Sequence, residues 1–359
     1  MKKFDSLFDK LYASIYEELQ GPDAIEWFPA YLCNSGCQYC GGYDRQARNG
    51  FEGVIPHEKI ERIVKESNMA GTTVWNIGGR GGEPLLYPDL MGVLFEIKRN
   101  NMKGILITNG LLLSDKFLVN LVDMRWDILR ISLDSSLSHI HDEIRGVPGN
   151  FERIDKALIL LNNLKKENGV NHPNVICCPV LTNKNYKYVL QYIDYCIERA
   201  VDEIQFMPLI GVHERANSLM LSLAQKQECV DLLKTRIDEQ RIKHNIGFIV
   251  SLYADTNKDH TAGHHEDNPL YCIHLWKTFV ISEDGYVSPC SLIKDKLLKI
   301  DSSYLQLWYS QELNLLRRKI LSGELINPAC RDCCGPLRNE TYDFNRYLIK
   351  RNFQENRII

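Results

Sequence analysis

The sequence predicts an α/β protein, a partial (β/α)6, TIM-like barrel followed by a small C-terminal α+β domain. Two features of the 359 residues indicate this fold. Six short apolar segments, five of them rich in Val and Ile, alternate with helical patterns, and cysteines cluster towards the two ends of the chain. Strands that are each followed by a helix pair in parallel through right-handed crossovers, and the functional face of such a barrel lies at the carboxyl ends of its strands.

Each barrel element follows from the spacing of its apolar residues. Runs bounded by Gly, Asn and Pro predict strands, whereas apolar residues three and four positions apart, such as Ile154, Leu158 and Leu161, predict helices. The expected strands are 24–32, 73–77, 104–108, 128–134, 174–181 and 203–210, and the expected helices are 57–69, 88–100, 114–124, 151–167 and 185–200.

The remaining segments set the expected domain boundaries. An amphipathic helix over 4–20 lies in an N-terminal segment 1–23, and the barrel is expected over 24–215. A linker region over 216–268 contains most of a helix expected over 215–243, a strand over 244–254 and a polar loop over 256–268. The small domain is expected over 269–340, and a charged C-terminal helix over 341–359.

Bulk composition excludes several classes of function. A net charge of −3, without a basic stripe, argues against a nucleic-acid partner. No segment has the roughly 18 apolar residues of a membrane span, and the first residues lack a secretory apolar core, so we expect a cytoplasmic protein without a membrane partner. In such a chain, twelve cysteines with clustered spacings favour metal binding over disulfides.

The front cluster is the loop Cys33-Asn-Ser-Gly-Cys37-Gln-Tyr39-Cys40, which follows the first expected strand. Three thiols on one short loop can point at one metal centre, and thiolates are soft ligands for iron–sulfur clusters or zinc. A structural zinc site needs four protein ligands, whereas this loop offers three. The loop therefore predicts a cluster with one open iron.

This spacing, with an aromatic residue before the last thiol, resembles the signature of the radical S-adenosylmethionine (radical SAM) superfamily. The resemblance implies a [4Fe–4S] cluster on Cys33, Cys37 and Cys40. It also implies that the amino and carboxylate groups of SAM chelate the open iron and that Tyr39 lies near the adenine.

Motifs at the following strand ends resemble the same family. The turn Gly81-Gly82-Glu83-Pro84 resembles the Gly-Gly-Glu-Pro motif, which implies that Gly81, Gly82 and Glu83 hold the SAM amino group. The role of Arg80, which precedes this turn, stays open.

Three further positions carry roles from the family. Thr108, in Thr-Asn-Gly at the third strand end, is expected to line the SAM cavity. Ser132 is expected to contact the SAM ribose or carboxylate, and Arg145 to pair with the carboxylate. A guanidinium matches a carboxylate in both charge and geometry. The sixth strand end, near Gly211, resembles the family's adenine-packing segment more loosely.

A second set of cysteines follows the linker. Two β-rich runs joined at Asp284-Gly285 predict a hairpin, which brings Cys272 and Cys290 together, and a helix over 304–322 returns the chain to Cys330 and Cys333. Four thiolates converging on one centre fit an iron–sulfur cluster or a closed zinc site.

This arrangement resembles the truncated SPASM, or twitch, domain. The resemblance implies a second, auxiliary [4Fe–4S] cluster held by Cys272, Cys290, Cys330 and Cys333. The adjacent Cys334 leaves the last ligand open, although the C-x-x-C spacing favours Cys333.

The family resemblance implies an enzyme that cleaves SAM to a 5′-deoxyadenosyl radical, which abstracts hydrogen from a small polar substrate. The twitch pattern is similar to that of the aminocyclitol dehydrogenases, so we expect an oxidoreductase acting on a sugar or aminocyclitol, with the auxiliary cluster accepting the electron. A donor such as flavodoxin or ferredoxin is the implied protein partner.

Two alternatives stay open. A peptide (RiPP) maturase often bears the same C-terminal domain, although the short segment before Ala24 leaves no room for a leader-recognition domain. A radical epimerase would need a cysteine hydrogen donor, for which Cys177, Cys178 and Cys334 are candidates. The sequence itself assigns no catalytic base.

Overall fold

The structure, a computed structural model, describes residues 21–41, 54–79, 81–209, 214–254, 274–291, 297–321, 324 and 326–327. The chain divides into two compact units. One comprises residues 27–55 and 75–256, and the other comprises 1–26, 56–74 and 257–359.

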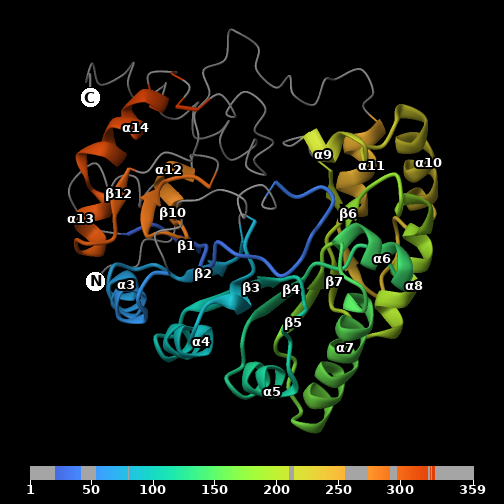
Figure 1. The fold of residues 1–359 in the computed structure, drawn as a ribbon, viewed down its shortest axis with the longest axis horizontal. Coiled ribbons are helices and arrows are strands. Elements are labelled where there is room, and N and C mark those ends of the chain that lie inside the picture. Colours follow the sequence, from blue (N-terminus) through green and yellow to red (C-terminus); the bar gives the residue numbers. More distant parts are fainter. Residues whose placement is uncertain are drawn as a thin grey trace. The chain divides into compact units, whose positions relative to one another are not determined.

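The larger unit is built on a parallel sheet (Figure 1). Its strands follow the order β2 (Val74–Ile77), β3 (Lys103–Thr108), β4 (Ile128–Ile131), β5 (Asn174–Cys177), β7 (Glu203–Ile204) and β9 (Lys243–His244). The first strand, β1 (Ala24–Trp27), spans the boundary between the units, and only Trp27 belongs to this one. The pairs from β3 through β9 are all parallel. Consecutive parallel strands place their carboxyl ends at one edge, which is where the site lies.

Amphipathic helices connect these strands. They are α4 (Leu90–Arg99), α5 (Asp115–Asp123), α6 (Ser138–Arg145), α7 (Asn150–Glu167), α8 (Val189–Glu198), α9 (Glu214–Asn217), α10 (Leu223–Lys234) and α11 (Ile246–Ala254), with 3-10 turns at Pro84–Leu86 and Tyr186–Tyr188. The α7 helix shows why they form, because Ile154, Ala157, Leu158 and Leu161 make one buried stripe. Ser114 caps α5 by accepting a hydrogen bond from the Phe117 amide.

Two expected strands are interrupted. The run over 174–181 forms β5 and then β6 (Val180–Leu181), and the run over 203–210 forms β7 and then β8 (Met207–Pro208). The break in the first run falls at Pro179, which has no N–H to donate to a ladder. Strands β6 and β8 pair in parallel as a separate two-stranded sheet.

The prediction of a strand over 244–254 is wrong, because most of this segment forms α11. Its continuous apolar run fits a buried strand and a buried helix equally well. The buried residues Ile246, Ile249 and Tyr253 recur at intervals of three and four, which is the spacing of a helix face.

The other unit contains the predicted hairpin. Strands β10 (Thr278–Ile281) and β11 (Tyr286–Ser288) pair antiparallel, and β12 (Leu298–Lys299) pairs with β11. Gly285 takes a φ of 79° in the turn, a conformation that glycine adopts without strain. Helices α3 (His57–Met69), α12 (His274–Lys277), α13 (Tyr304–Trp308) and α14 (Gln311–Leu321) complete this unit.

The helix expected over 304–322 is therefore two helices, separated at Tyr309-Ser310. Helix α13 packs on α3 through polar contacts. Tyr304 Oη lies 2.9 Å from Thr72 Oγ1, and the Tyr304 amide donates to Glu66 Oε2 at 2.6 Å.

The predicted fold class is confirmed, since a parallel β/α unit is joined by a small α+β unit. The expected helices over 4–20 and 341–359, the loop over 256–268, Ile210-Gly211 and Arg80 lie outside the described residues. None of the described helices combines the length and apolar composition of a membrane span.

Candidate functional site

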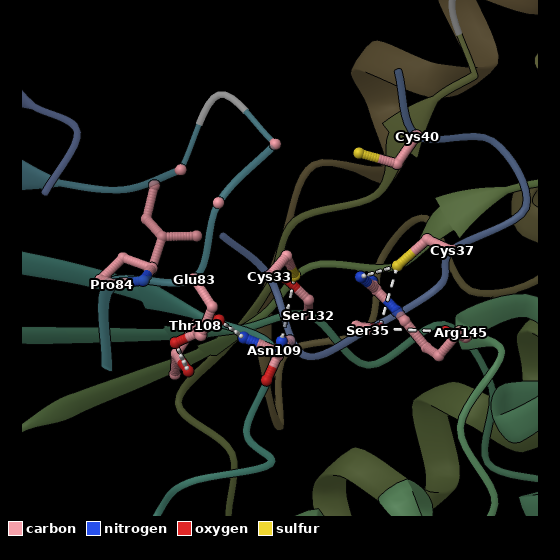
Figure 2. Close-up of a pocket in the computed structure, with 14 residues that line it drawn as sticks. Cys33, Ser35, Cys37, Cys40, Glu83, Pro84, Thr108, Asn109, Ser132 and Arg145 are labelled. Atoms are coloured by element: carbon pink, nitrogen blue, oxygen red, sulfur yellow. Dashed lines mark hydrogen bonds between the residues drawn. The ribbon is translucent and has the colours of Figure 1, made fainter. Parts of the chain in front are cut away.

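A pocket opens at the carboxyl ends of β2, β3 and β4 (Figure 2). It encloses about 600 Å³, including its open mouth. Its lining brings together almost all of the site residues predicted for the barrel: Cys33, Ser35, Cys37, Cys40, Gly79, Gly81, Gly82, Glu83, Pro84, Ile107, Thr108, Asn109, Ser132 and Arg145. Of the predicted barrel residues, Tyr39 alone does not line it.

The cysteine loop is fixed by its own main chain. The Gly36 amide donates to Arg145 O at 3.0 Å, and the Gln38 amide donates to Ile144 O at 2.9 Å. Ser35 Oγ also donates to Arg145 O, at 3.0 Å. The loop lies so close to the end of α6 that a Cβ on Gly146, whose φ is 66°, would approach Gly36 O to 2.6 Å.

The three thiols lie around the pocket in different settings. Cys37 is buried, and its Sγ lies 3.3 Å from Ser35 Oγ and accepts from Arg145 Nη1 at 3.6 Å. Cys33 Sγ accepts from Asn109 Nδ2 at 3.7 Å. Burial raises the pKa of Cys33 to about 11. This thiol needs a positive partner such as iron to lose its proton at neutral pH.

The donor set fits an iron–sulfur cluster. Across the described ranges, no three Cys, His, Asp or Glu side chains close around a position for a single metal ion. The pocket is instead lined by Cys33, Cys37 and Cys40 together. Three soft thiolates are suitable ligands for an iron–sulfur cluster.

The glycine turn requires glycine. A Cβ on Gly82 would come within 1.8 Å of Ala30 O, and one on Gly79 within 1.8 Å of Gly82 O. Gly81 takes a φ of 115°, which is unfavourable for residues with a side chain. The main chain of this turn is therefore exposed to the pocket without covering side chains, and a ligand can approach the amides and carbonyls of the turn.

Glu83 fastens this turn to the end of β3. Its Oε1 accepts from Thr108 Oγ1 at 2.6 Å and from the Leu85 amide at 3.2 Å, and its Oε2 accepts from the Asn109 amide at 2.9 Å. Burial raises the pKa of this carboxyl, while the three donors oppose that shift. Glu83 and Thr108 thus hold the pocket wall together.

Ser132 and Arg145 also line the pocket. The Ser132 amide donates to Thr108 O at 3.0 Å, which extends the β3–β4 ladder into the pocket. Arg145 Nε lies 2.7 Å from Asp134 Oδ2, although the N–H does not point along a hydrogen bond. Both side chains are buried, so this is an ion pair shielded from water.

Tyr39, on the cysteine loop itself, contacts both members of this ion pair. Its hydroxyl donates to Asp134 Oδ2 at 3.1 Å, and its ring faces the Arg145 guanidinium at 5.7 Å. His141 completes the arrangement, because its Nδ1 accepts from the Asp134 amide at 3.0 Å. Burial and the charge of Arg145 lower the pKa of His141, so the ring is neutral.

Sequence reasoning missed Asp134 and Ser35 as site residues, and it included Asn109 only as part of the Thr-Asn-Gly strand end. The signal for Asp134 was a lone acidic residue directly after an apolar strand and two positions beyond Ser132. Its partner Arg145 is eleven positions away, across α6, so the pairing depends on the fold.

Of the expected auxiliary ligands, only Cys290 lies in the described part of the chain. It follows β11, where its amide donates to Ser288 Oγ at 3.3 Å and its carbonyl accepts from the same hydroxyl at 2.8 Å. Cys272, Cys330, Cys333 and Cys334 lie outside the described residues, so the auxiliary ligand set stays a prediction.

Relatives of this chain act on different molecules, to judge by their names. It is 23% identical over 324 residues, 84% of each chain, to the tungsten-containing aldehyde ferredoxin oxidoreductase cofactor-modifying protein of Pyrococcus furiosus. It is 28% identical over 279 residues, 75% of this chain and 84% of the relative, to a probable GTP 3′,8-cyclase of Methanococcus maripaludis.

Solved structures share the fold. SuiB of Streptococcus suis, crystallised with S-adenosylmethionine, matches with a TM-score of 0.67 and 18% identity, covering 90% of this chain and 73% of SuiB. Native anSMEcpe with bound AdoMet matches with a TM-score of 0.61 and 19% identity, covering 92% of this chain and 96% of that one.

Two family models match this chain in succession. Residues 27–196 match the Radical SAM superfamily, and residues 272–334 match the SPASM iron–sulfur cluster-binding domain. The first range contains the whole pocket, and the second contains the hairpin and the rear cysteines. The chain therefore belongs to the radical SAM superfamily, an enzyme family of [4Fe–4S] clusters and S-adenosylmethionine, and carries a C-terminal SPASM-type domain.

Proposed function

We propose that this enzyme is an oxidoreductase that removes hydrogen from a carbon of a small polar molecule, such as a sugar or an aminocyclitol. The observation that carries the proposal is the single pocket in which three thiols, a bare glycine turn and Ser132 meet. When bound, the first cluster and SAM supply a 5′-deoxyadenosyl radical, and the auxiliary cluster supplies an acceptor for the second electron.

The residues of this chain would bind and orient these groups. Cys33, Cys37 and Cys40 would hold the first cluster, and the Gly81-Gly82 backbone would receive the SAM amino group. Ser132 would contact the ribose or carboxylate. Arg145, already paired with Asp134, would present its remaining N–H groups to the SAM carboxylate.

Two considerations support a small molecule and an oxidation. The curated relatives are named for a reaction of a nucleotide and for modification of a cofactor, and both targets are smaller than a protein. The SPASM match supports a second cluster, which gives a substrate radical a nearby electron acceptor. Oxidation of a secondary alcohol then releases one hydrogen atom, one electron and one proton and leaves a ketone.

The test uses anaerobically reconstituted enzyme with SAM, a reductant, and a panel of polyols, amino sugars and aminocyclitols. The expected result is substrate-dependent 5′-deoxyadenosine in equal amount to a ketone product. If no member of the panel raises 5′-deoxyadenosine while peptide libraries do, the proposal fails in favour of peptide modification.

Epimerisation is tested in the same reaction run in deuterium oxide. Of the candidate hydrogen donors, Cys177 is fully buried and its thiol contacts Cys196, whereas Cys178 is partly exposed. Deuterium in a recovered substrate of unchanged oxidation state would contradict oxidation, and its loss in Cys178→Ala would identify the donor.

A further inference from the structure

The face of β4 that carries Ser132 also carries a charged residue, Arg130, two positions earlier along the strand. Side chains of a strand alternate between its two faces, so Arg130 shares a face with Ser132 and lies about 6.5 Å from it along the strand. Ile107, the register partner of Arg130 on β3, lines the pocket together with Ser132. Leu129 and Ile131 on the other face are fully buried. Arg130 therefore lies on the pocket side of the sheet.

The guanidinium of Arg130 has no partner in the part of the chain that the structure describes. Its Nε is enclosed and makes no hydrogen bond, and no ion pair joins it to an acidic side chain of the described ranges. Arg130 is half-buried, and a partly desolvated cation gains from a counter-charge, so this position favours a ligand of opposite charge.

Two polar groups of the neighbouring strands lie on the same face as Arg130, one in its own row and one in the row of Ser132. Ile176 of β5 is the register partner of both Arg130 and Glu203. Glu203 therefore lies two strands away from Arg130, with roughly 10 Å between their Cα atoms. Cys178 follows β5, and its amide donates to Ile131 O at 2.9 Å. Burial raises the pKa of Cys178 to about 12, and the charge of Arg130 opposes that shift.

We propose that Arg130 binds an oxyanion of the substrate, a carboxylate or a phosphate group, on the inner face of the barrel beneath the SAM pocket. This inference rests on the proposed function, because it assigns the substrate class of the same site. The planar guanidinium matches two oxygens of either group. Glu203 accepts a hydrogen bond from a hydroxyl or amine of the same molecule and repels a second anion. The substrate class is therefore an acidic or phosphorylated polyol.

The experiment uses the full-length reconstituted enzyme with SAM bound, and calorimetric titration with inorganic phosphate and, separately, with acetate. Saturable binding is expected for one of the two probes, and that probe identifies the group. Arg130→Gln should weaken this binding on the order of tenfold or more, since a charge-assisted contact is lost. Arg125→Gln, which removes an exposed arginine five positions earlier in the chain, is the matched control and should bind like the wild type.

Two further variants test whether anion binding depends on the shape of the Arg130 side chain and on the charge of Glu203. Arg130→Lys retains the charge without the planar fork and should bind with intermediate affinity. Glu203→Gln should tighten anion binding. If Arg130 instead serves as the ion-pair partner of Glu203, each single variant would lower the melting temperature and the double variant would recover it, which overturns the proposal.

Reductive cleavage of SAM by the wild-type enzyme distinguishes a failure of the proposed function from a failure of the Arg130 assignment. Enzyme that never cleaves SAM refutes the proposed function itself. Enzyme that cleaves SAM but shows no saturable binding of either probe, or equal binding in Arg130→Gln, refutes only the assignment of Arg130.

Discussion

Arg145 Nε lies 2.7 Å from Asp134 Oδ2, and the two side chains are 7% and 0% exposed. The same guanidinium donates to Cys37 Sγ, so one buried cation links the cysteine loop to the end of β4. The carboxylate in turn accepts from Tyr39 and from the Val180 amide. This ion pair therefore holds several segments of the pocket wall in position.

Breaking this pair from one side should destabilise the protein strongly. Asp134→Asn leaves a buried guanidinium without its counter-charge, and we expect the free energy of unfolding to fall by about 3–5 kcal/mol. The double variant Asp134→Asn with Arg145→Gln should lose less than the sum of the single variants. Urea unfolding of all four proteins measures the coupling, and strictly additive losses would contradict the ion pair.

Cys33, Cys37 and Cys40 should each be required for one of the two clusters, and therefore for half of the iron that the protein binds. In Cys33→Ala, Cys37→Ala or Cys40→Ala, iron should fall from about eight to about four atoms per chain, since one of two cubane clusters is lost. Iron and sulfide analysis of reconstituted protein measures this. Cys229→Ala, which changes a buried cysteine on α10, is the control and should keep the full content. A full iron content in the front variants would refute the assigned ligands.

Gly82→Ala should disable the glycine turn. Its Cβ would lie 1.8 Å from Ala30 O, so the backbone must move, and SAM affinity should fall on the order of tenfold or more. Equilibrium dialysis with SAM measures the effect in the cluster-loaded protein. Gly247→Ala is the matched control, because no heavy atom lies within 4 Å of its Cβ position in α11. Alanine should leave SAM affinity unchanged there and stabilise the helix by up to about 1 kcal/mol.

Thr108→Val should weaken the anchor of Glu83. The substitution keeps the side-chain volume but removes the hydroxyl that donates to Glu83 Oε1, and the buried carboxylate then lacks one donor. We expect a loss of about 1–3 kcal/mol in the free energy of unfolding. Thr108→Ser retains the hydroxyl and should lose less. Equal losses in the two variants would assign the effect to packing instead.

Much of this site could be predicted because its residues are local to strand ends. The cysteine loop, the glycine turn, Thr108 and Ser132 each follow a strand of a parallel sheet, and the carboxyl ends of such strands meet at one edge. The order of the strands therefore brings these residues into one pocket without any knowledge of tertiary contacts.

What could not be predicted depends on long-range pairing or on ambiguous periodicity. Asp134 is an ordinary acidic residue until α6 brings Arg145 against it. The segment forming α11 is apolar throughout, so only its packing against α10 decides between helix and strand. The division of β5 from β6 follows from a single proline, whose effect on a ladder depends on its position in the sheet.

The attachment of the cysteine loop to α6 has a consequence for how the enzyme acquires and keeps its metal. The Gly36 and Gln38 amides bind carbonyl oxygens, so the course of the loop is independent of the side chains at positions 38 and 144. We therefore expect iron and sulfide to be inserted into a loop whose backbone is already held by these hydrogen bonds. Damage to the cluster by oxygen, and its later rebuilding, would leave the surrounding backbone in place.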